Sequence, residues 1–290
     1  MGKHAYLIMA HGKFDQLKIL LDLLDDPRND IFLHIDRKAQ FDNDMLLPNL
    51  RYSKVFIVTR TSVTWGGYSQ INCEFQLIKR AVEYFTYDYL HLLSGVDLPI
   101  KSQDEIHDFF SRNSGNEYME IVASESQNEI EKRCKYYWLF QEQLARHEKM
   151  NIYRVINWIG IKMQQFLKVK RIPENIKIKK GANWFSITGE LAKYIISQEK
   201  NIEKWFRHSV CADELFIQTI AYNSEYRGNI SGDNFLRLID WERGNPYIFR
   251  LEDYQLIKDS EYLFARKFDL DVDSGIVEMI SAITKGGEVK

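Results

Sequence analysis

The chain has 290 residues, of which 45% are apolar and 28% are charged. An apolar fraction of this size supports a sizeable core, so a disordered chain is excluded. Basic residues number 39 and acidic residues 41, which gives a formal net charge of -2. This balance argues against a general polyanion binder, and no nucleic-acid partner is expected.

Cysteine usage and the lack of long apolar runs bear on the compartment. Cys73, Cys134 and Cys211 are widely spaced and form no C-x-x-C pair, which favours neither a disulfide framework nor a zinc site. The apolar run near the N-terminus is too short for a signal peptide, and no run reaches the roughly 18 residues that span a membrane. We therefore expect a cytoplasmic protein.

The first third of the chain alternates short β-rich runs with helical patterns. Strands are expected over residues 5–9, 31–35, 55–58 and 87–93, and helices over 14–24 and 68–84. This alternation predicts an α/β fold with a mostly parallel central sheet flanked by helices. Such sheets bind ligands at the carboxyl ends of their strands.

Polar or small residues directly follow three of these strands. They are His11, Asp36, Arg37, Ser94, Gly95 and Asp97. We expect them to converge at one edge of the sheet. An aspartate there can accept hydrogen bonds from a uracil or a ribose, and a glycine lets the backbone approach a ligand closely. Turn formation and helix capping would explain each residue taken singly.

The middle of the chain changes in character. Ser102 and Glu105 have the spacing of a capping box, and a strand is expected over residues 118–121. Residues 139–167 are expected to be helical with an apolar stripe. A basic cluster follows, made up of Lys168, Lys170, Arg171, Lys177, Lys179 and Lys180. An amphipathic basic element such as 162–180 can lie on an anionic membrane surface, and a solvated lid is the alternative.

The next segment contains one carboxylate of particular interest. A strand is expected over residues 181–188 and a helix over 189–198. Further on, Asp213 is expected to cap a helix, which puts Glu214 in the first turn. A carboxylate is stabilised there by the helix N-terminus, so a structural role explains Glu214 without any chemistry.

Two cations and three carboxylates lie near the end of the chain. Arg266 and Lys267 close an apolar run, where a lysine can act as a point charge on a phosphate and an arginine can fork onto one. A solvated helix start is the plain alternative. The carboxylates at Asp269, Asp271 and Asp273 alternate as metal ligands do, but they lack the glycine and distal glutamate of a calcium loop. We interpret them as residues that cap a helix and position Lys267.

Several segments together resemble one known family. They are AHGKFDQL, HIDRKA, SVTWGGYSQINCEFQLIKRAV, LLSGVDLPIKS, GANWFSIT, ADE and FARKFD. In this order they resemble the core-2/I-branching β-1,6-N-acetylglucosaminyltransferase family (glycosyltransferase family 14), which includes the peptide O-xylosyltransferases, and a bacterial-type member in particular. Ala182 replaces a usual serine, Ala212 replaces a usual proline, and residues 125–180 depart most from the family.

The resemblance implies a GT-A-type nucleotide-sugar-binding fold and an inverting transfer from a UDP-sugar, with the strand-end residues contacting the nucleotide. Glu214 would be the catalytic base. Lys267 and Arg243 would bind the diphosphate in place of a metal ion, so no metal or other cofactor is expected. Residues 95–97 read Gly-Val-Asp where many transferases of this architecture carry an Asp-x-Asp metal motif.

The acceptor side is less sharply indicated. Glu120, Lys132, Arg133, Trp184 and Trp241 are interpreted as acceptor contacts. A tryptophan can stack on a sugar face, although Trp184 fits a core position equally well. Lys132 and Arg133 also fit a solvated helix face.

The resemblance implies a single glycosyltransferase domain over residues 1–290. Its parts would be a nucleotide-binding half (1–124), a variable helical and basic insertion (125–180) and an acceptor and catalytic half (181–290). We expect transfer of N-acetylglucosamine or a related sugar to an oligosaccharide or lipid-linked glycan in bacterial surface polysaccharide synthesis, on the inner face of the membrane. The alternative is a non-catalytic nucleotide- or glycan-binding protein on the same scaffold, docked to a membrane.

Overall fold

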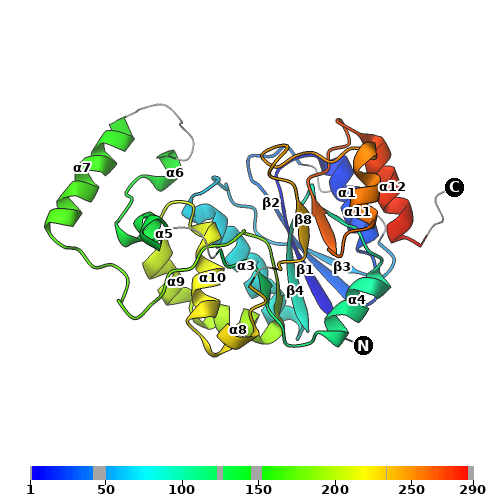
Figure 1. Cartoon of the computed structure of the whole chain (residues 1–290), viewed down its shortest axis with the longest axis horizontal. Coiled ribbons are helices and arrows are strands. Elements are labelled where there is room, and N and C mark those ends of the chain that lie inside the picture. Colours follow the sequence, from blue (N-terminus) through cyan, green and yellow to red (C-terminus); the bar gives the residue numbers. More distant parts are fainter. Residues whose placement is uncertain (1, 42–49, 123–126, 145–151, 233, 287–290) are drawn as a thin grey trace.

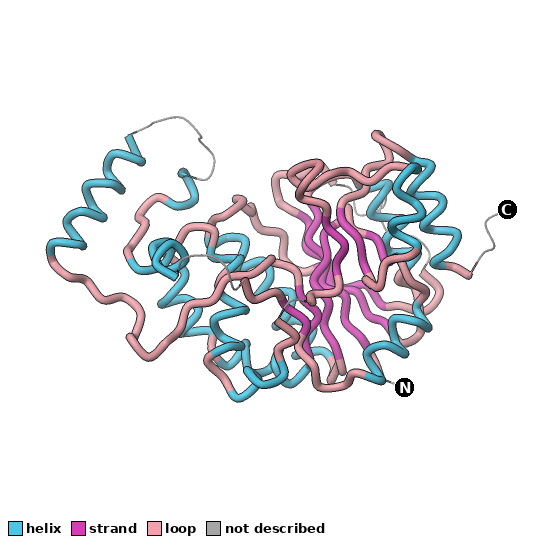
Figure 2. Tube along the Cα trace, viewed as in Figure 1, coloured by secondary structure: helices cyan, strands magenta, loops and turns pink. Residues whose placement is uncertain are grey.

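The computed structural model describes residues 2–41, 50–122, 127–144, 152–232 and 234–286. Within these residues a six-stranded sheet forms the centre of the molecule (Figure 2). In spatial order its strands are β3 (Lys54–Ile57), β2 (Asn29–Ile35), β1 (His4–Ala10), β4 (Tyr89–Ser94), β7 (Phe185–Thr188) and β6 (Tyr118–Met119). The first four are parallel and β7 is antiparallel to both of its neighbours, which confirms the mostly parallel sheet.

Helices cover both faces of this sheet (Figure 1). The helices in the described part of the chain are α1 (Phe14–Leu23), α3 (Tyr68–Tyr84), α4 (Gln103–Arg112), α5 (Gln127–Lys135), α6 (Gln141–Leu144), α7 (Ile152–Phe166), α8 (Gly189–Ser197), α9 (Glu199–Phe206), α10 (Phe216–Tyr222), α11 (Tyr254–Lys258) and α12 (Ser274–Thr284). Side chains of β1 alternate between two cores: Leu7 packs with α3 and α8, whereas Ile8 packs with α1 and α12. Burial on both faces explains why the parallel strands read as apolar runs.

A smaller sheet brings the end of the chain back to the central one. Its order is β5 (Leu98–Pro99), β9 (Phe264–Arg266) and β8 (Arg237–Ile239) within the described residues. Leu98 pairs with Ala265, and the amide of Phe268 donates to the carbonyl of Val96 at 3.0 Å. The cations that end β9 are thereby held beside the loop that follows β4.

The short 3-10 helices are η1 (Ala212–Glu214), η2 (Glu225–Asn229) and η3 (Leu251–Asp253). The capping box at the start of α4 is confirmed: the Ser102 hydroxyl accepts from the Glu105 amide and the Glu105 carboxylate accepts from the Ser102 amide. The strand expected over 181–188 starts only at Phe185, and the strand expected over 118–121 ends at Met119.

Residues 139–167 do not form a single described helix. The structure has α6 and α7 there, and residues 145–151 lie outside the described part. Helix α7 lies at the outer left of Figure 1, away from the central sheet. None of the helices in the described ranges has the length and apolar content needed to cross a bilayer.

Candidate functional site

Parallel strands β1, β2 and β4 deliver their following residues to one edge of the sheet. The amide of Asp36 donates to the carbonyl of Ala10 at 2.8 Å, and the amide of Gly95 donates to the carbonyl of Met9 at 3.0 Å. A Cβ on Gly95 would lie 3.2 Å from the Ala10 Cβ, so a larger residue would crowd this edge. The three loops therefore meet, as the strand order requires.

The Asp36 loop combines a buried carboxylate with the exposed side chain of Arg37. Asp36 is buried, and its carboxylate accepts from the Lys38 amide at 2.8 Å and from the Val63 amide at 3.3 Å. The side chains of Arg37 and His11 are exposed. Asp36 thus shapes the loop, while Arg37 and His11 are open to a ligand.

Asp97 is the centre of a polar network at the end of β4. Its carboxylate accepts from the Ser94 amide and hydroxyl, both at 2.7 Å, and from Nη1 of Arg266 at 2.8 Å. The Arg266 guanidinium also lies over the Trp184 ring, 4.7 Å from its centroid. Asp97 is buried, so this ion pair is stronger than a surface pair of the same geometry.

Arg266 is a site residue that the sequence reasoning left out of its assignments. The signal was present, because Arg266 precedes Lys267 at the end of an apolar run. The pairing of Arg266 with Ser94 and Asp97 spans about 170 residues and leaves no local pattern: the two contacts have sequence separations of 172 and 169.

Lys267 and Arg243 differ in how their charges are compensated. Arg243 donates to Asp240 and, at 2.7 Å, to Asp253, and it stacks on Tyr247. Among the described residues, the Lys267 ammonium has no hydrogen-bond or ion-pair partner. Its charge is therefore the more readily available of the two to an incoming anion.

The alternating carboxylates after Lys267 have partners other than a metal. Burial alone would raise the pKa of Asp269, but a hydrogen bond from Lys13 and the charge of Lys267 hold that pKa below its usual value. Lys13 also pairs with Asp271 at 2.6 Å, and Asp273 caps α12 through the Ile276 amide at 3.1 Å. Within the described residues no group of His, Cys, Asp and Glu side chains is arranged to hold a metal ion.

Glu214 lies in η1 with its side chain 33% exposed. Its Oε2 accepts from Nη1 of Arg133 at 2.8 Å, and the Lys180 ammonium is 3.9 Å away. Cys211, the residue before η1, has a left-handed φ of 46°, and its amide donates to the Gly66 carbonyl at 2.9 Å. A partly exposed carboxylate with two cations beside it is thus fixed in direction.

Asp213 turns away from Glu214 into the protein. Its carboxylate accepts from Nε2 of Gln70 at 2.9 Å, and burial, followed by the charge of Glu214, raises its pKa to about 7. Glu74 on α3 is fully buried nearby, and burial followed by the charge of Asp213 raises its pKa well above the usual value. The expected capping role of Asp213 is wrong, because Leu215 is the N-cap of α10.

The segment from Gly181 to Trp184 links Glu214 to the sheet edge. The Gly181 amide donates to the Glu214 carbonyl at 3.1 Å, and the Ala182 amide donates to the Glu120 carboxylate at 2.7 Å. A Cβ on Gly181 would fall 1.8 Å from the Glu120 carbonyl oxygen, which leaves room only for glycine. Trp184, three residues on, carries the Arg266 contact.

The proposed acceptor residues do not all share one place in the fold. Glu120, Arg133 and Trp184 are each tied to the Gly181–Glu214 region by the contacts above. Lys132 is exposed on α5. Trp241 is exposed on the loop after β8, two residues before Arg243.

Polar loops meet at the carboxyl ends of the parallel strands and are connected to a paired, partly exposed carboxylate, and this edge is where α/β folds ordinarily bind ligands. The family model described as Branch: Core-2/I-Branching enzyme matches residues 4–257. This chain therefore belongs to the Core-2/I-branching enzyme family.

Similar proteins are named xylosyltransferases. Xylosyltransferase 2 of Mus musculus is 22% identical, with 95% of this chain and 33% of that protein covered. Xylosyltransferase sqv-6 of Caenorhabditis briggsae is 24% identical, covering 95% and 36%. The chain thus spans about a third of the length of these relatives. A solved structure assigned as a glucose-1-phosphate thymidylyltransferase of Bacillus anthracis aligns with 99% of this chain at 9% identity and a TM-score of 0.39.

Proposed function

We propose that this protein transfers a sugar, with inversion and without a metal ion, from a UDP-sugar to a hydroxyl of an oligosaccharide or lipid-linked glycan. Family membership supports sugar transfer, and the layout of the sheet edge supports a nucleotide-sugar site of the GT-A type. The main support for the proposal is the position of Glu214, a partly exposed carboxylate that Arg133 fixes beside the Gly181–Trp184 segment. N-acetylglucosamine or xylose is the expected sugar, and a bacterial surface polysaccharide is the expected product.

Glu214 acts as the general base in this proposal. As the acceptor oxygen forms its bond to C1 of the sugar, its proton moves to the Glu214 carboxylate. The bond from C1 to the UDP oxygen breaks on the opposite face, and its electron pair stays on the diphosphate. A positioned base of this kind contributes about 10²- to 10⁴-fold to the rate.

Fixed cations stabilise the leaving group. Lys267 meets the diphosphate directly, since its ammonium forms no hydrogen bond or ion pair among the described residues. Arg243 joins it only by exchanging Asp240 or Asp253 for phosphate oxygens. Preorganised charges of this kind lower the barrier without reorganisation during the reaction.

The hydrogen bonds of Asp97 favour a site without a metal ion of the Asp-x-Asp type. Its carboxylate is buried and already accepts from Ser94 and Arg266. A cation at this carboxylate would displace the arginine. In the proposal the loop from Ser94 to Asp97 therefore contacts the nucleotide through its backbone and through the Arg266 and Trp184 pair.

Two substitutions separate the proposed roles. Glu214→Gln should leave UDP affinity intact and lower turnover by about 10²- to 10⁴-fold. Lys267→Ala should weaken UDP binding. Glu225→Gln, which removes an exposed carboxylate from η2, is the matched control and should change neither quantity.

Turnover would be assayed with UDP-N-acetylglucosamine and UDP-xylose, and affinity by calorimetry. Equal loss of UDP affinity in both site variants would contradict the division of roles. UDP binding by the unaltered protein without transfer from any UDP-sugar to any glycan acceptor would instead favour a non-catalytic binding protein.

A further inference from the structure

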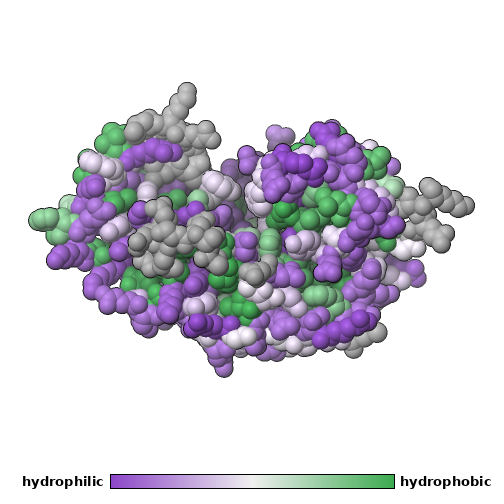
Figure 3. Space-filling view, in the orientation of Figure 1, coloured by the Kyte–Doolittle hydropathy of each residue, from purple (hydrophilic) through white to green (hydrophobic). Residues whose placement is uncertain are grey.

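Helix α7 exposes an unusual set of large apolar side chains. They are Ile152, Val155, Ile156, Ile159, Met163 and Phe166, which we call the α7 face. Their exposed fractions run from 40% at Ile156 to 85% at Phe166. Figure 3 shows apolar residues at the outer left of the molecule, over this helix.

The α7 face is one continuous stripe. At about 100° per residue, its six members fall within an arc of roughly 100° on the helix surface. Trp158 and Lys162 border this arc on one side, with the Lys162 ammonium 6.0 Å from the Trp158 ring centroid. Trp158 is itself largely exposed, which adds an amphipathic ring to the border of the stripe.

The opposite side of α7 contacts the protein through polar side chains. Asn157 is buried, and its side-chain oxygen accepts from the Leu139 amide at 2.9 Å. The Gln164 amide group accepts from the Tyr137 amide at 2.8 Å and donates to the Tyr137 carbonyl at 3.1 Å. A surface helix ordinarily turns its apolar stripe inward, so α7 is reversed. A reversed helix presents its apolar side to something outside the chain.

The segment is also rich in positive charge. Residues 152–172 contain five basic residues and no acidic one, although the chain as a whole has a net charge of -2. These residues are Arg154, Lys162, Lys168, Lys170 and Arg171. Lys162, Lys168 and Lys170 are exposed, and Lys170 pairs with Glu174. The partner of this surface therefore carries negative charge beside apolar material.

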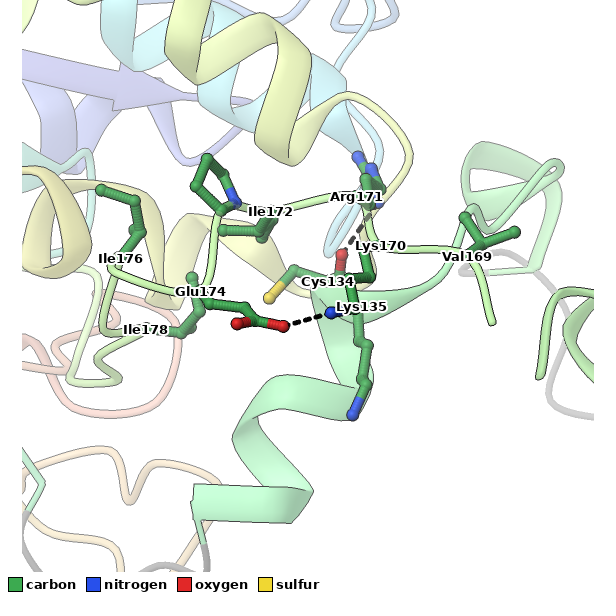
Figure 4. Close-up of a pocket in the computed structure, with 10 residues that line it drawn as sticks. Cys134, Lys135, Val169, Lys170, Arg171, Ile172, Glu174, Ile176 and Ile178 are labelled. Atoms are coloured by element: carbon green, nitrogen blue, oxygen red, sulfur yellow. Dashed lines mark hydrogen bonds and ion pairs between the residues drawn. The ribbon is translucent and has the colours of Figure 1, made fainter. Parts of the chain in front are cut away.

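Arg171 has a different task from its neighbours. It is buried, stacks on Tyr137, and donates from Nη1 to the carbonyls of Tyr136 at 2.9 Å and His208 at 2.8 Å. Figure 4 shows the hydrogen bond from Arg171 to the Cys134 carbonyl. It lies beside a pocket of about 270 Å³, which is lined in part by the segment that follows α7. The chain that follows α7 is thus tied to the body, and Asn157 and Gln164 tie the helix itself, so the α7 face is held out rather than free to fold over the site.

We propose that the α7 face docks on an anionic lipid bilayer. The exposed apolar stripe, the tryptophan at its border and the lysines beside it are the features with which interfacial helices enter the headgroup region. A second copy of the chain fits less well, because pairing two α7 faces would bring like charges together. Docking does not depend on the proposed sugar transfer, and a failure of either leaves the other standing.

Vesicle sedimentation tests this proposal with the full chain. One set of vesicles contains equal parts of phosphatidylcholine and phosphatidylglycerol, and the other contains phosphatidylcholine alone. We expect at least about tenfold stronger partitioning to the anionic vesicles, weakened by added salt. The triple variant Ile159→Ser, Met163→Ser, Phe166→Ser should abolish binding, and Lys162→Gln with Lys168→Gln should reduce it.

A matched control uses Leu251→Ser with Leu256→Ser, two exposed leucines at the other side of the molecule near η3 and α11. This variant should bind vesicles as the unaltered protein does. Circular dichroism would establish that each variant is folded. Absence of vesicle binding, equal binding to both lipid compositions, or a concentration-dependent dimer that the triple variant loses would each overturn the proposal.

Discussion

Acid should destabilise this fold through His107. The His107 ring is stacked on His4 at 4.0 Å between centroids and bonded to the Asn29 side chain at 2.9 Å. Burial, followed by the charge of Arg28, lowers its pKa from 6.5 to about 4. As the pH falls below 6.5, His107 becomes protonated in the unfolded chain but stays neutral in the folded chain, so the free energy of unfolding decreases. At pH 5 this one group accounts for about 2 kcal/mol.

The variant His107→Gln keeps a donor for Asn29 and removes the titration. Urea unfolding at pH 7.5 and pH 5 would be compared for both proteins. The loss of stability between the two pH values should be smaller by about 2 kcal/mol in the variant. Each protein is compared with itself at the two pH values because Glu117 also titrates in this range. Burial raises the pKa of Glu117 to about 7, so its protonation increases the free energy of unfolding as the pH falls.

Phe109→Leu is a matched control on the same helix, since it removes no titrating group. It should lower the free energy of unfolding equally at both pH values. The same pH dependence in His107→Gln as in the unaltered protein would refute the reasoning.

Three further substitutions test contacts around the site. Asp97→Asn should cost about 2 kcal/mol of unfolding free energy, because Arg266, whose side chain is only 19% exposed, loses its charged partner; an unchanged melting temperature would argue against the ion pair. Gly181→Ala should cost at least about 2 kcal/mol, since its Cβ meets the Glu120 carbonyl, whereas Gly228→Ala has open space and serves as the control. Arg171→Met should cost about 3 kcal/mol and speed proteolysis between residues 130 and 180, because three carbonyls each lose the hydrogen bond that the guanidinium donates; uniform proteolysis would contradict the anchoring role.

Much of the fold was predictable from local patterns. The helix over Tyr68–Tyr84 has the expected bounds, since its apolar residues recur at helical spacing and turn signals flank it. The meeting of the Asp36 and Gly95 loops followed from strand order in a parallel sheet. These features depend on short-range periodicity and on a general topological rule.

Other features depend on contacts between residues far apart in the sequence, which a local sequence pattern does not reveal. Asp213 has the local spacing of a cap, but the distant Gln70 side chain binds its carboxylate instead. Helix α7 has an amphipathic pattern that any surface helix could show, and only the contacts of Asn157 and Gln164 reveal that the polar side faces inward. The role of Arg266 likewise required the pairing of β9 with β5.

Titration of UDP into the protein by calorimetry, in excess EDTA and again in Mg²⁺ or Mn²⁺, tests the central claim most directly. The account predicts the same affinity in both conditions and a clear loss in Lys267→Ala. Binding that appears only with the metal ion would contradict it.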